Sequence, residues 1–184
     1  MSKLILASAS PRRRELLAQV GYVFEVCPAH IDETRHTDED PSAYVARLAL
    51  EKAQAIHAQH PGAVVLGADT TVVLNGEVLN KPQDREDAAR MLRALSGRTH
   101  QVFTGIAVVA SNVQRTHVET TNVVFAPIPE DELATYLATG DSLDKAGAYG
   151  IQGYAARWIP RIEGDFFNVM GLPLVATVRL LAGV

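Results

Sequence analysis

A cluster of hydroxyl and guanidinium groups follows the first apolar run of the chain. Ser8 and Ser10 stand there, and Arg12, Arg13 and Arg14 come directly after a proline. Ser10 suits the N-cap of a helix and proline its first position, so the arginines fall in the first turn. Because the helix dipole leaves partial positive charge at that end, arginine is unfavourable there unless an anion is bound. The segment indicates an oxyanion site that fits phosphate, or alternatively three solvated arginines.

Two acidic residues, Asp69 and Glu33, could act on such a phosphate ester. Asp69 directly follows the apolar run 63–68, which is typical of a buried strand, and α/β proteins build their sites at the carboxyl ends of strands. A turn or a helix cap is the alternative, although the β-type sequence that follows argues against a cap. Glu33 alone reads as a solvated acid of an acidic loop. Beside Asp69 it gains weight, because two carboxylates and a substrate phosphate form a Mg²⁺ site.

A phosphorylated aspartate is a less attractive interpretation of Asp69. That class of enzyme usually carries a second aspartate two residues further on, and Thr71 occupies this position. A serine nucleophile has no support either, because the Gly-x-Ser-x-Gly pattern is absent. The histidines show no metal-ligand spacing. The acids are therefore better suited to metal binding and to proton transfer from water.

Three lysines are further cationic candidates: Lys52, Lys81 and Lys145. Lys52 lies on the apolar stripe of a predicted helix, four residues after Leu48 and four before Ile56. A lysine in that position either extends to the helix edge with its stem packed, or binds a phosphate. Lys81 stands where a predicted hairpin ends.

The segment 144–153 combines Lys145, Tyr149 and Gln152 with several glycines. Its glycine content argues against a helix, and it lacks the alternation of a strand. Glycines allow the backbone to approach a ligand closely, the aromatic ring could pack on a base, and the amide could read the edge of that base. A flexible surface loop is the alternative. No Gly-Lys-Ser/Thr sequence closes the segment, so it is not a Walker motif.

The elements that must position these residues follow from hydrophobic periodicity and from breakers. The pattern predicts a mixed α/β protein with parallel and antiparallel pairing. The expected elements, in chain order, are strand 3–7, helix 11–20, strand 22–26, helix 41–59, strand 63–68, a hairpin over 71–79 turning at Asn75-Gly76, helix 84–95, strands 100–110 and 116–125, helix 130–138, strand 155–162 and helix 172–181.

Composition limits the classes of function. The 184 residues are 47% hydrophobic and carry a net charge of −4, which argues against a nucleic-acid-coating protein. Cys27 is the only cysteine, so no internal disulfide can form and a reducing compartment is expected. The N-terminus does not resemble a signal peptide, and no run approaches the ~20 apolar residues of a membrane span. We expect a cytoplasmic protein that binds neither membranes nor nucleic acid.

Several segments together resemble the Maf family of nucleoside triphosphate pyrophosphatases, first named for inhibition of septum formation. The resemblance runs from Leu4 to the last helix, and the combination of motifs is specific although each is weak alone. The segments are Ser8-Ala9-Ser10-Pro11-Arg12-Arg13, Ile31-Asp32-Glu33, Leu48-Ala49-Leu50-Glu51-Lys52-Ala53, Gly67-Ala68-Asp69-Thr70, Leu79-Asn80-Lys81-Pro82, Leu95-Ser96-Gly97, 144–153 and Asn168-Val169-Met170-Gly171-Leu172-Pro173.

The resemblance implies a single domain over 1–184 with an elongated mixed sheet, flanking helices and two lobes around a central cleft, similar to inosine triphosphate pyrophosphatases. It implies homodimers, Mg²⁺ or Mn²⁺, and hydrolysis between the α and β phosphates. The motifs resemble those of the subgroup that acts on dTTP and UTP, rather than those of the subgroup that acts on 7-methyl-GTP. The alternative is a non-catalytic nucleotide-binding regulator of cell division, which would tolerate the loss of Asp69 or Glu33.

The resemblance also implies roles for individual residues. The family's general base maps onto Asp69, and its specificity positions map onto Arg12, Thr70 and Gln152. With the candidates found above, the catalytic set is Asp69, Lys52 and Glu33, and Glu33 and Asp69 are the metal ligands. The expected substrate-binding residues are Ser8, Ser10, Arg12, Arg13, Lys81, Thr70, Lys145, Tyr149 and Gln152.

Overall fold

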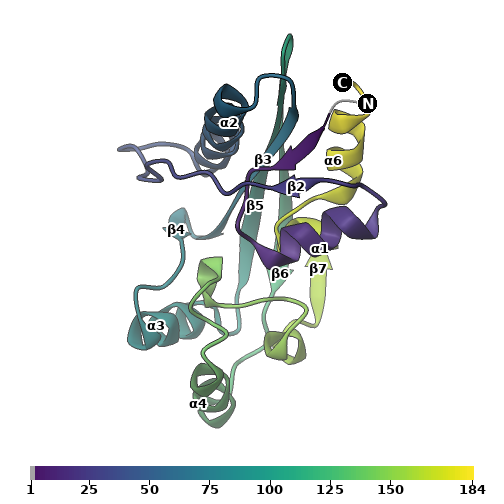
Figure 1. The fold of residues 1–184 in the computed structure, drawn as a ribbon. Helices are drawn as coiled ribbons and strands as arrows, with labels where there is room; N and C mark the ends of the chain where they lie inside the picture. Colours follow the sequence, from purple (N-terminus) through teal and green to yellow (C-terminus); the bar gives the residue numbers. More distant parts are fainter. Residues whose placement is uncertain (1–2) are drawn as a thin grey trace. The chain divides into compact units, whose positions relative to one another are not determined.

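The computed structural model describes residues 3–184, and its strands form one mixed β-sheet accompanied by helices (Figure 1). Within this range the sheet has seven strands in the order β2-β1-β3-β5-β6-β7, with β4 paired to β3. The strands are β1 (Leu4–Leu6), β2 (Glu25–Val26), β3 (Val64–Leu74), β4 (Glu77–Leu79), β5 (Thr99–Ala110), β6 (Val113–Val124) and β7 (Arg161–Glu163). The helices are α1 (Pro11–Gln19), α2 (Pro41–Gln59), α3 (Arg85–Leu95), α4 (Glu130–Thr139), the 3₁₀ turns η1 (Ala146–Ala148) and η2 (Tyr154–Trp158), α5 (Phe166–Met170) and α6 (Leu174–Leu181).

Both kinds of strand pairing that the sequence predicts are present. β1 pairs in parallel with β2 and with β3, and the last β1 residue, Leu6, lies opposite Leu66. Parallel neighbours need a crossover, and α1 provides the one between β1 and β2. β4 on β3 and β7 on β6 pair antiparallel. The mixed α/β class is therefore confirmed.

The chain divides into two compact units. Unit 1 contains the chain up to Thr70, with Thr104–Glu119 and Gly171–Val184, and unit 2 contains Thr71–Phe103 and Thr120–Met170. Strands β3, β5 and β6 each contribute residues to both units. The predicted cleft between two lobes stays a prediction.

The core of unit 1 is formed by α2 and the central strands, which lie beside it in Figure 1. The approach is close at Gly67 of β3, where a Cβ atom would lie 2.1 Å from the carbonyl oxygen of Ala49. Gly105 of β5 allows the same approach, at 2.3 Å from the carbonyl oxygen of Val45. Side chains could not fit between these backbones, so the two glycines bring α2 directly onto the sheet.

The core of unit 2 is built from α3, α4 and the two 3₁₀ turns around the ends of the strands. Its aromatic centre joins Tyr136 to Tyr154, with ring centroids 5.7 Å apart and planes nearly parallel. Trp158 meets Tyr136 edge-on at 5.6 Å. These contacts bury the apolar side chains of a segment that has little regular secondary structure.

Two sequence-based assignments of elements are wrong. The predicted strand 155–162 is the 3₁₀ turn η2 followed by the short β7. Ala155 and Trp158 are both buried, and a spacing of three places them on one side of a helical turn but on opposite faces of a strand. The predicted strand 63–68 does not end before Asp69, because β3 continues through the β-branched residues that follow to Leu74.

The hairpin and the long helix agree with prediction. Asn75 and Gly76 link β3 to β4 with φ angles of 52° and 85°, the left-handed conformations that a two-residue hairpin turn requires. α2 begins at Pro41 behind the N-cap Asp40, whose carboxylate accepts a hydrogen bond from the Ser42 N–H at 2.8 Å. No helix within residues 3–184 has the length and apolar character needed to span a bilayer.

Candidate active site

Arg13 is the centre of a hydrogen-bond network at the start of α1. Its Nε donates to the carbonyl oxygen of Gly171 at 2.8 Å, Nη1 to Ser8 Oγ at 3.2 Å and Nη2 to Thr70 Oγ1 at 2.9 Å. Ser10 is the N-cap that the sequence predicts, and its Oγ accepts from the Arg13 N–H at 3.4 Å. A planar guanidinium therefore fixes three separate segments of unit 1 around the first turn of α1.

The charge around this turn is unbalanced in favour of cations. No acidic residue lies in the first turn of α1, although three arginines do. Burial lowers the pKa of Arg13, and the neighbouring Arg12 acts in the same direction, while Asp69 opposes both. Arg14 is exposed, but Arg12 and Arg13 are half-buried. The alternative of three solvated arginines is therefore wrong for Arg12 and Arg13. The turn has a positive electrostatic potential, which a bound anion would neutralise.

Lys52 lies between the two candidate carboxylates. Its Nζ is 2.7 Å from Asp69 Oδ1 and 2.8 Å from Glu33 Oε1. The residue is only 8% exposed, because the apolar stripe of α2 that carries it packs against the sheet. The alternative in which Lys52 extends to solvent at the helix edge is wrong. A buried ammonium group is tolerated here because two carboxylates neutralise it.

Asp69 is a buried carboxylate in the middle of β3, with 8% of its surface exposed. Burial raises the pKa of its carboxyl group above the ordinary value, although Lys52 and Arg13 both lower it and partly offset that effect. A raised pKa makes this group a better proton acceptor than a surface aspartate, while Lys52 keeps it charged. The arrangement suits a general base.

The topology explains why the site lies where it does in unit 1. β1 ends at Leu6 opposite Leu66, so the chain leaves the sheet toward Ser8 while β3 continues to Asp69 and Thr70. Thr70 Oγ1, which accepts from Arg13, also lies 2.9 Å from Thr104 Oγ1 on β5. The residues beyond the end of a parallel strand are the usual location of sites in α/β proteins.

The donor set at Glu33 and Asp69 fits a divalent metal such as Mg²⁺ or Mn²⁺. Both side chains offer hard carboxylate oxygens, and both reach the same Lys52 ammonium group, so they converge on one cation already. Within residues 3–184 no group of three or more potential metal-ligating side chains exists. An ion at this position would therefore need oxygens from a substrate phosphate and from water as well. The Glu33 side chain is 53% exposed, which leaves that side open.

The predicted base-binding segment belongs to unit 2, and its residues differ in accessibility. Gln152 is exposed, and Lys145 donates to Asp144 Oδ1 at 2.6 Å. Tyr149 is 5% exposed, and its ring meets the edge of Phe125 at 4.8 Å between centroids. The expectation that a base stacks on the Tyr149 ring is therefore wrong, because that ring is packed in the core.

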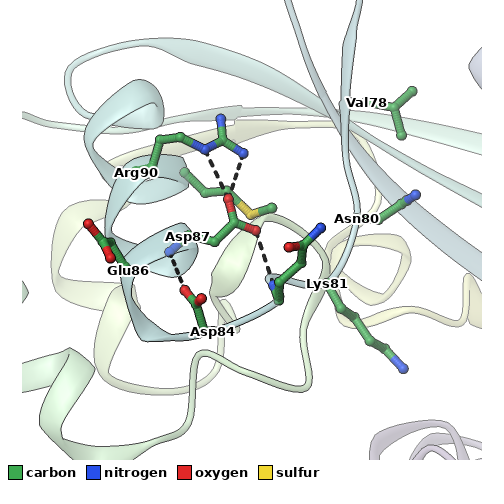
Figure 2. Close-up of a pocket in the computed structure, with 9 residues that line it drawn as sticks. Val78, Asn80, Lys81, Asp84, Glu86, Asp87 and Arg90 are labelled. Carbon is green, nitrogen blue, oxygen red and sulfur yellow. Dashed lines mark hydrogen bonds and ion pairs between the residues drawn. The ribbon is translucent and has the colours of Figure 1, made fainter.

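Lys81 lines a pocket of about 440 Å³ on unit 2, which Figure 2 shows. The acids around it already serve α3: Asp84 accepts from the Asp87 N–H at 2.8 Å, and Asp87 pairs with Arg90 at 2.8 Å. The Lys81 side chain extends away from these acids in Figure 2. The carboxylates would repel a triphosphate inside this pocket, and the substrate-binding role of Lys81 stays a prediction.

Two residues in the network of Arg13 had no assigned role in the sequence analysis. Thr104 lies inside a predicted strand, where a threonine is ordinary. Gly171 was part of a family motif, but it contributes its main-chain oxygen rather than a side chain. Its φ of 104° lies in the left-handed region, which glycine adopts readily. The glycine before Leu172-Pro173 was therefore the sequence signal for a special backbone conformation at this position.

Comparisons with known proteins identify the family and similar sequences. The family described as "Maf-like protein" matches residues 3–184. A protein from Moorella thermoacetica named dTTP/UTP pyrophosphatase is 55% identical, over 99% of this chain and 95% of its own length. Proteins with the same name from Koribacter versatilis and from an Escherichia coli strain are 53% and 52% identical. These matches cover 97% and 99% of this chain, and 92% and 93% of the relatives' lengths.

Solved structures with low sequence identity share the fold. The Ham1 protein of Staphylococcus aureus has a TM-score of 0.56 at 15% identity, and the match covers 99% of both chains. A HAM1 protein from Coxiella burnetii has a TM-score of 0.50 at 18% identity, over 70% of this chain and 75% of that one. At such identities the likeness concerns architecture alone.

Proposed function

Because the chain belongs to the Maf-like protein family over nearly its whole length, we propose that it hydrolyses dTTP and UTP to the monophosphate and pyrophosphate. The observation that carries this proposal is the pairing of Lys52 with Asp69 and Glu33, next to the cationic first turn of α1. A phosphoanhydride needs charge neutralisation and an activated water, and these side chains provide the means for both.

In the mechanism that we propose, Asp69 orients the attacking water and accepts its proton. Lys52 keeps that carboxylate ionised while it is buried. Arg12, Arg13 and Lys52 neutralise the charge of the triphosphate, with Lys81 as a further cation. Glu33 and Asp69 would hold Mg²⁺ or Mn²⁺, which when bound supplies further charge neutralisation and lowers the pKa of water. Positioning and electrostatics suffice, so no covalent enzyme intermediate is needed.

Substrate selection is proposed to depend on Arg12, Thr70 and Gln152. Gln152 is exposed and its amide has both donors and an acceptor, so it can read the edge of a base. Thr70 is engaged by Arg13 and lies beside Thr104, which restricts its hydroxyl to a few orientations. A fixed hydroxyl discriminates better than a mobile one, because the wrong substrate leaves it unpaired.

Pyrophosphate release from a panel of nucleotides tests this function. The panel contains dTTP, UTP, CTP, 7-methyl-GTP and ITP, each with Mg²⁺ or Mn²⁺. We expect release from dTTP and UTP above the others. Release from other nucleotides alone would overturn the subgroup, whereas nucleotide binding with no release from any would favour the regulator.

Assembly and location are separate proposals. We propose a homodimer that acts in the cytoplasm on free nucleotides, without a nucleic-acid or membrane partner. The net charge of −4 supports the lack of general nucleic-acid binding. Light scattering would test the dimer. DNA binding at physiological salt would contradict the proposal that the protein has no nucleic-acid partner.

A further inference from the structure

A buried histidine holds the tyrosine of the glycine-rich segment in unit 2. His100 is 2% exposed, and its Nε2 lies 2.7 Å from the hydroxyl oxygen of Tyr149. The two rings meet edge-on at 5.4 Å between centroids, and Phe125 packs against both, at 4.9 Å from His100 and 4.8 Å from Tyr149. The three rings therefore surround this hydrogen bond with aromatic carbon. A hydrogen bond in such a low-dielectric environment is electrostatically stronger than one in water.

The second nitrogen of His100 shows that packing alone does not account for this residue. Among residues 3–184 its Nδ1 has no hydrogen-bond partner, although it is buried. Burial lowers the pKa of His100 to about 4 and raises the pKa of Tyr149, so both groups are neutral. Leaving a buried nitrogen unpaired is costly, and a phenylalanine would avoid that cost. The bond to Tyr149 is the compensating interaction.

The segment next to Tyr149 has a conformation that needs an anchor. Ala148 has a φ of 64°, in the left-handed region that L-residues with a Cβ avoid, and it is fully buried. Gly147 precedes it with a φ of 67°. The Tyr136 hydroxyl donates to the carbonyl oxygen of Ala148 at 3.2 Å, so the turn is fixed from both sides. Such strain persists only where the surroundings impose it.

We propose that His100 is a positioning residue for nucleotide selection, acting through Tyr149 to hold the turn 147–149 and, with it, the exposed Gln152. This inference rests on the proposed function, because it takes Gln152 to read the base. Gln152 follows Tyr149 by three residues and lies in a turn that a hydrogen bond from the Gly153 N–H to the Gly150 carbonyl oxygen closes at 3.1 Å. Because this turn follows Tyr149 directly, releasing the Tyr149 hydroxyl should loosen the turn and Gln152 with it.

Hydrogen exchange tests the anchor without depending on activity. We expect amide exchange over 147–152 to become about tenfold faster in His100→Phe and in Tyr149→Phe, since one buried hydrogen bond is lost. His100→Gln keeps a polar nitrogen near the Nε2 position and should restore most of the protection. Phe125→Leu is the matched control, because it disturbs the same cluster without removing the bond. Unchanged exchange in His100→Phe would overturn the proposal.

Kinetics then test nucleotide selection. We expect His100→Phe to raise KM for dTTP more than it lowers kcat, and to reduce the preference for dTTP over dCTP on the order of tenfold. Combining it with Tyr149→Phe should add no further loss, whereas Phe125→Leu should keep the preference. An unchanged preference with faster exchange would overturn the role in selection. If the wild-type protein released no pyrophosphate, the proposed function would fail, and the exchange experiment would still decide on the anchor.

Discussion

At the scale of single residues, the two ion pairs of Lys52 determine the chemistry that unit 1 can do. Lys52, itself buried between two carboxylates, favours the ionised form of the buried Asp69 carboxylate. Burial raises the pKa of Asp69, and Lys52 is the strongest influence that lowers it. The proton acceptance that we propose for Asp69 therefore depends on a neighbour 17 residues away in sequence.

The pH dependence of kcat/KM should show this directly. Asp69 must be ionised to accept a proton, and burial raises its pKa, so activity should fall with decreasing pH above the ordinary aspartate value of about 3.9. Lys52→Met should move this acid limb to higher pH, because the charge that favours the ionised Asp69 is lost. Lys3→Met is the control, since the pair that Lys3 forms with Glu25 is exposed. An acid limb at the same pH in Lys52→Met would contradict the coupling.

At the scale of elements, the contact between α2 and β3 sets the position of Lys52 relative to Asp69. Gly67→Ala should therefore damage both stability and activity, because the new Cβ would lie 2.1 Å from the Ala49 carbonyl oxygen. We expect a loss of about 2–3 kcal/mol in the free energy of unfolding, measured with urea. Gly62→Ala is the matched control, since nothing lies within 4 Å of its Cβ position. Equal stability of the two variants would refute the close packing.

The elements that could be predicted from sequence are those whose signals are local. Asp40, Pro41 and the apolar stripe predicted α2 with its observed bounds, and Asn75-Gly76 predicted the hairpin. The stripe placed Lys52 on the apolar face of α2, but it left open whether the side chain is buried. Its partners could not be predicted, because Glu33 lies in an irregular loop. The bond from Arg13 to Gly171 joins residues 158 positions apart, and no local pattern indicates such a contact. The base stacking expected of the Tyr149 ring was wrong because an aromatic ring suits a core as well as a ligand.

At the scale of the whole molecule, His100 should make folding stability depend on pH. Its pKa is about 4 when folded, against an ordinary value of 6.5, so the unfolded chain binds the proton more tightly. The stabilisation that comes from an uncharged His100 in the folded state is complete above pH 6.5. It is lost as the pH falls toward 4, which lowers the free energy of unfolding by about 3 kcal/mol. Urea unfolding at several pH values should show the slope, and His100→Gln should flatten it. The same slope in that variant would exclude His100 as its source.

Asp69→Asn tests the central claim, that the Lys52-paired carboxylate carries out the hydrolysis. The substitution keeps the size of the side chain and removes the basic oxygen. With dTTP and a divalent metal, we predict that nucleotide affinity changes little while pyrophosphate release falls by ~10²-fold or more. Unfolding by urea would verify that the variant is folded. Turnover near the wild-type rate in the folded variant would contradict the assignment of Asp69 as the base.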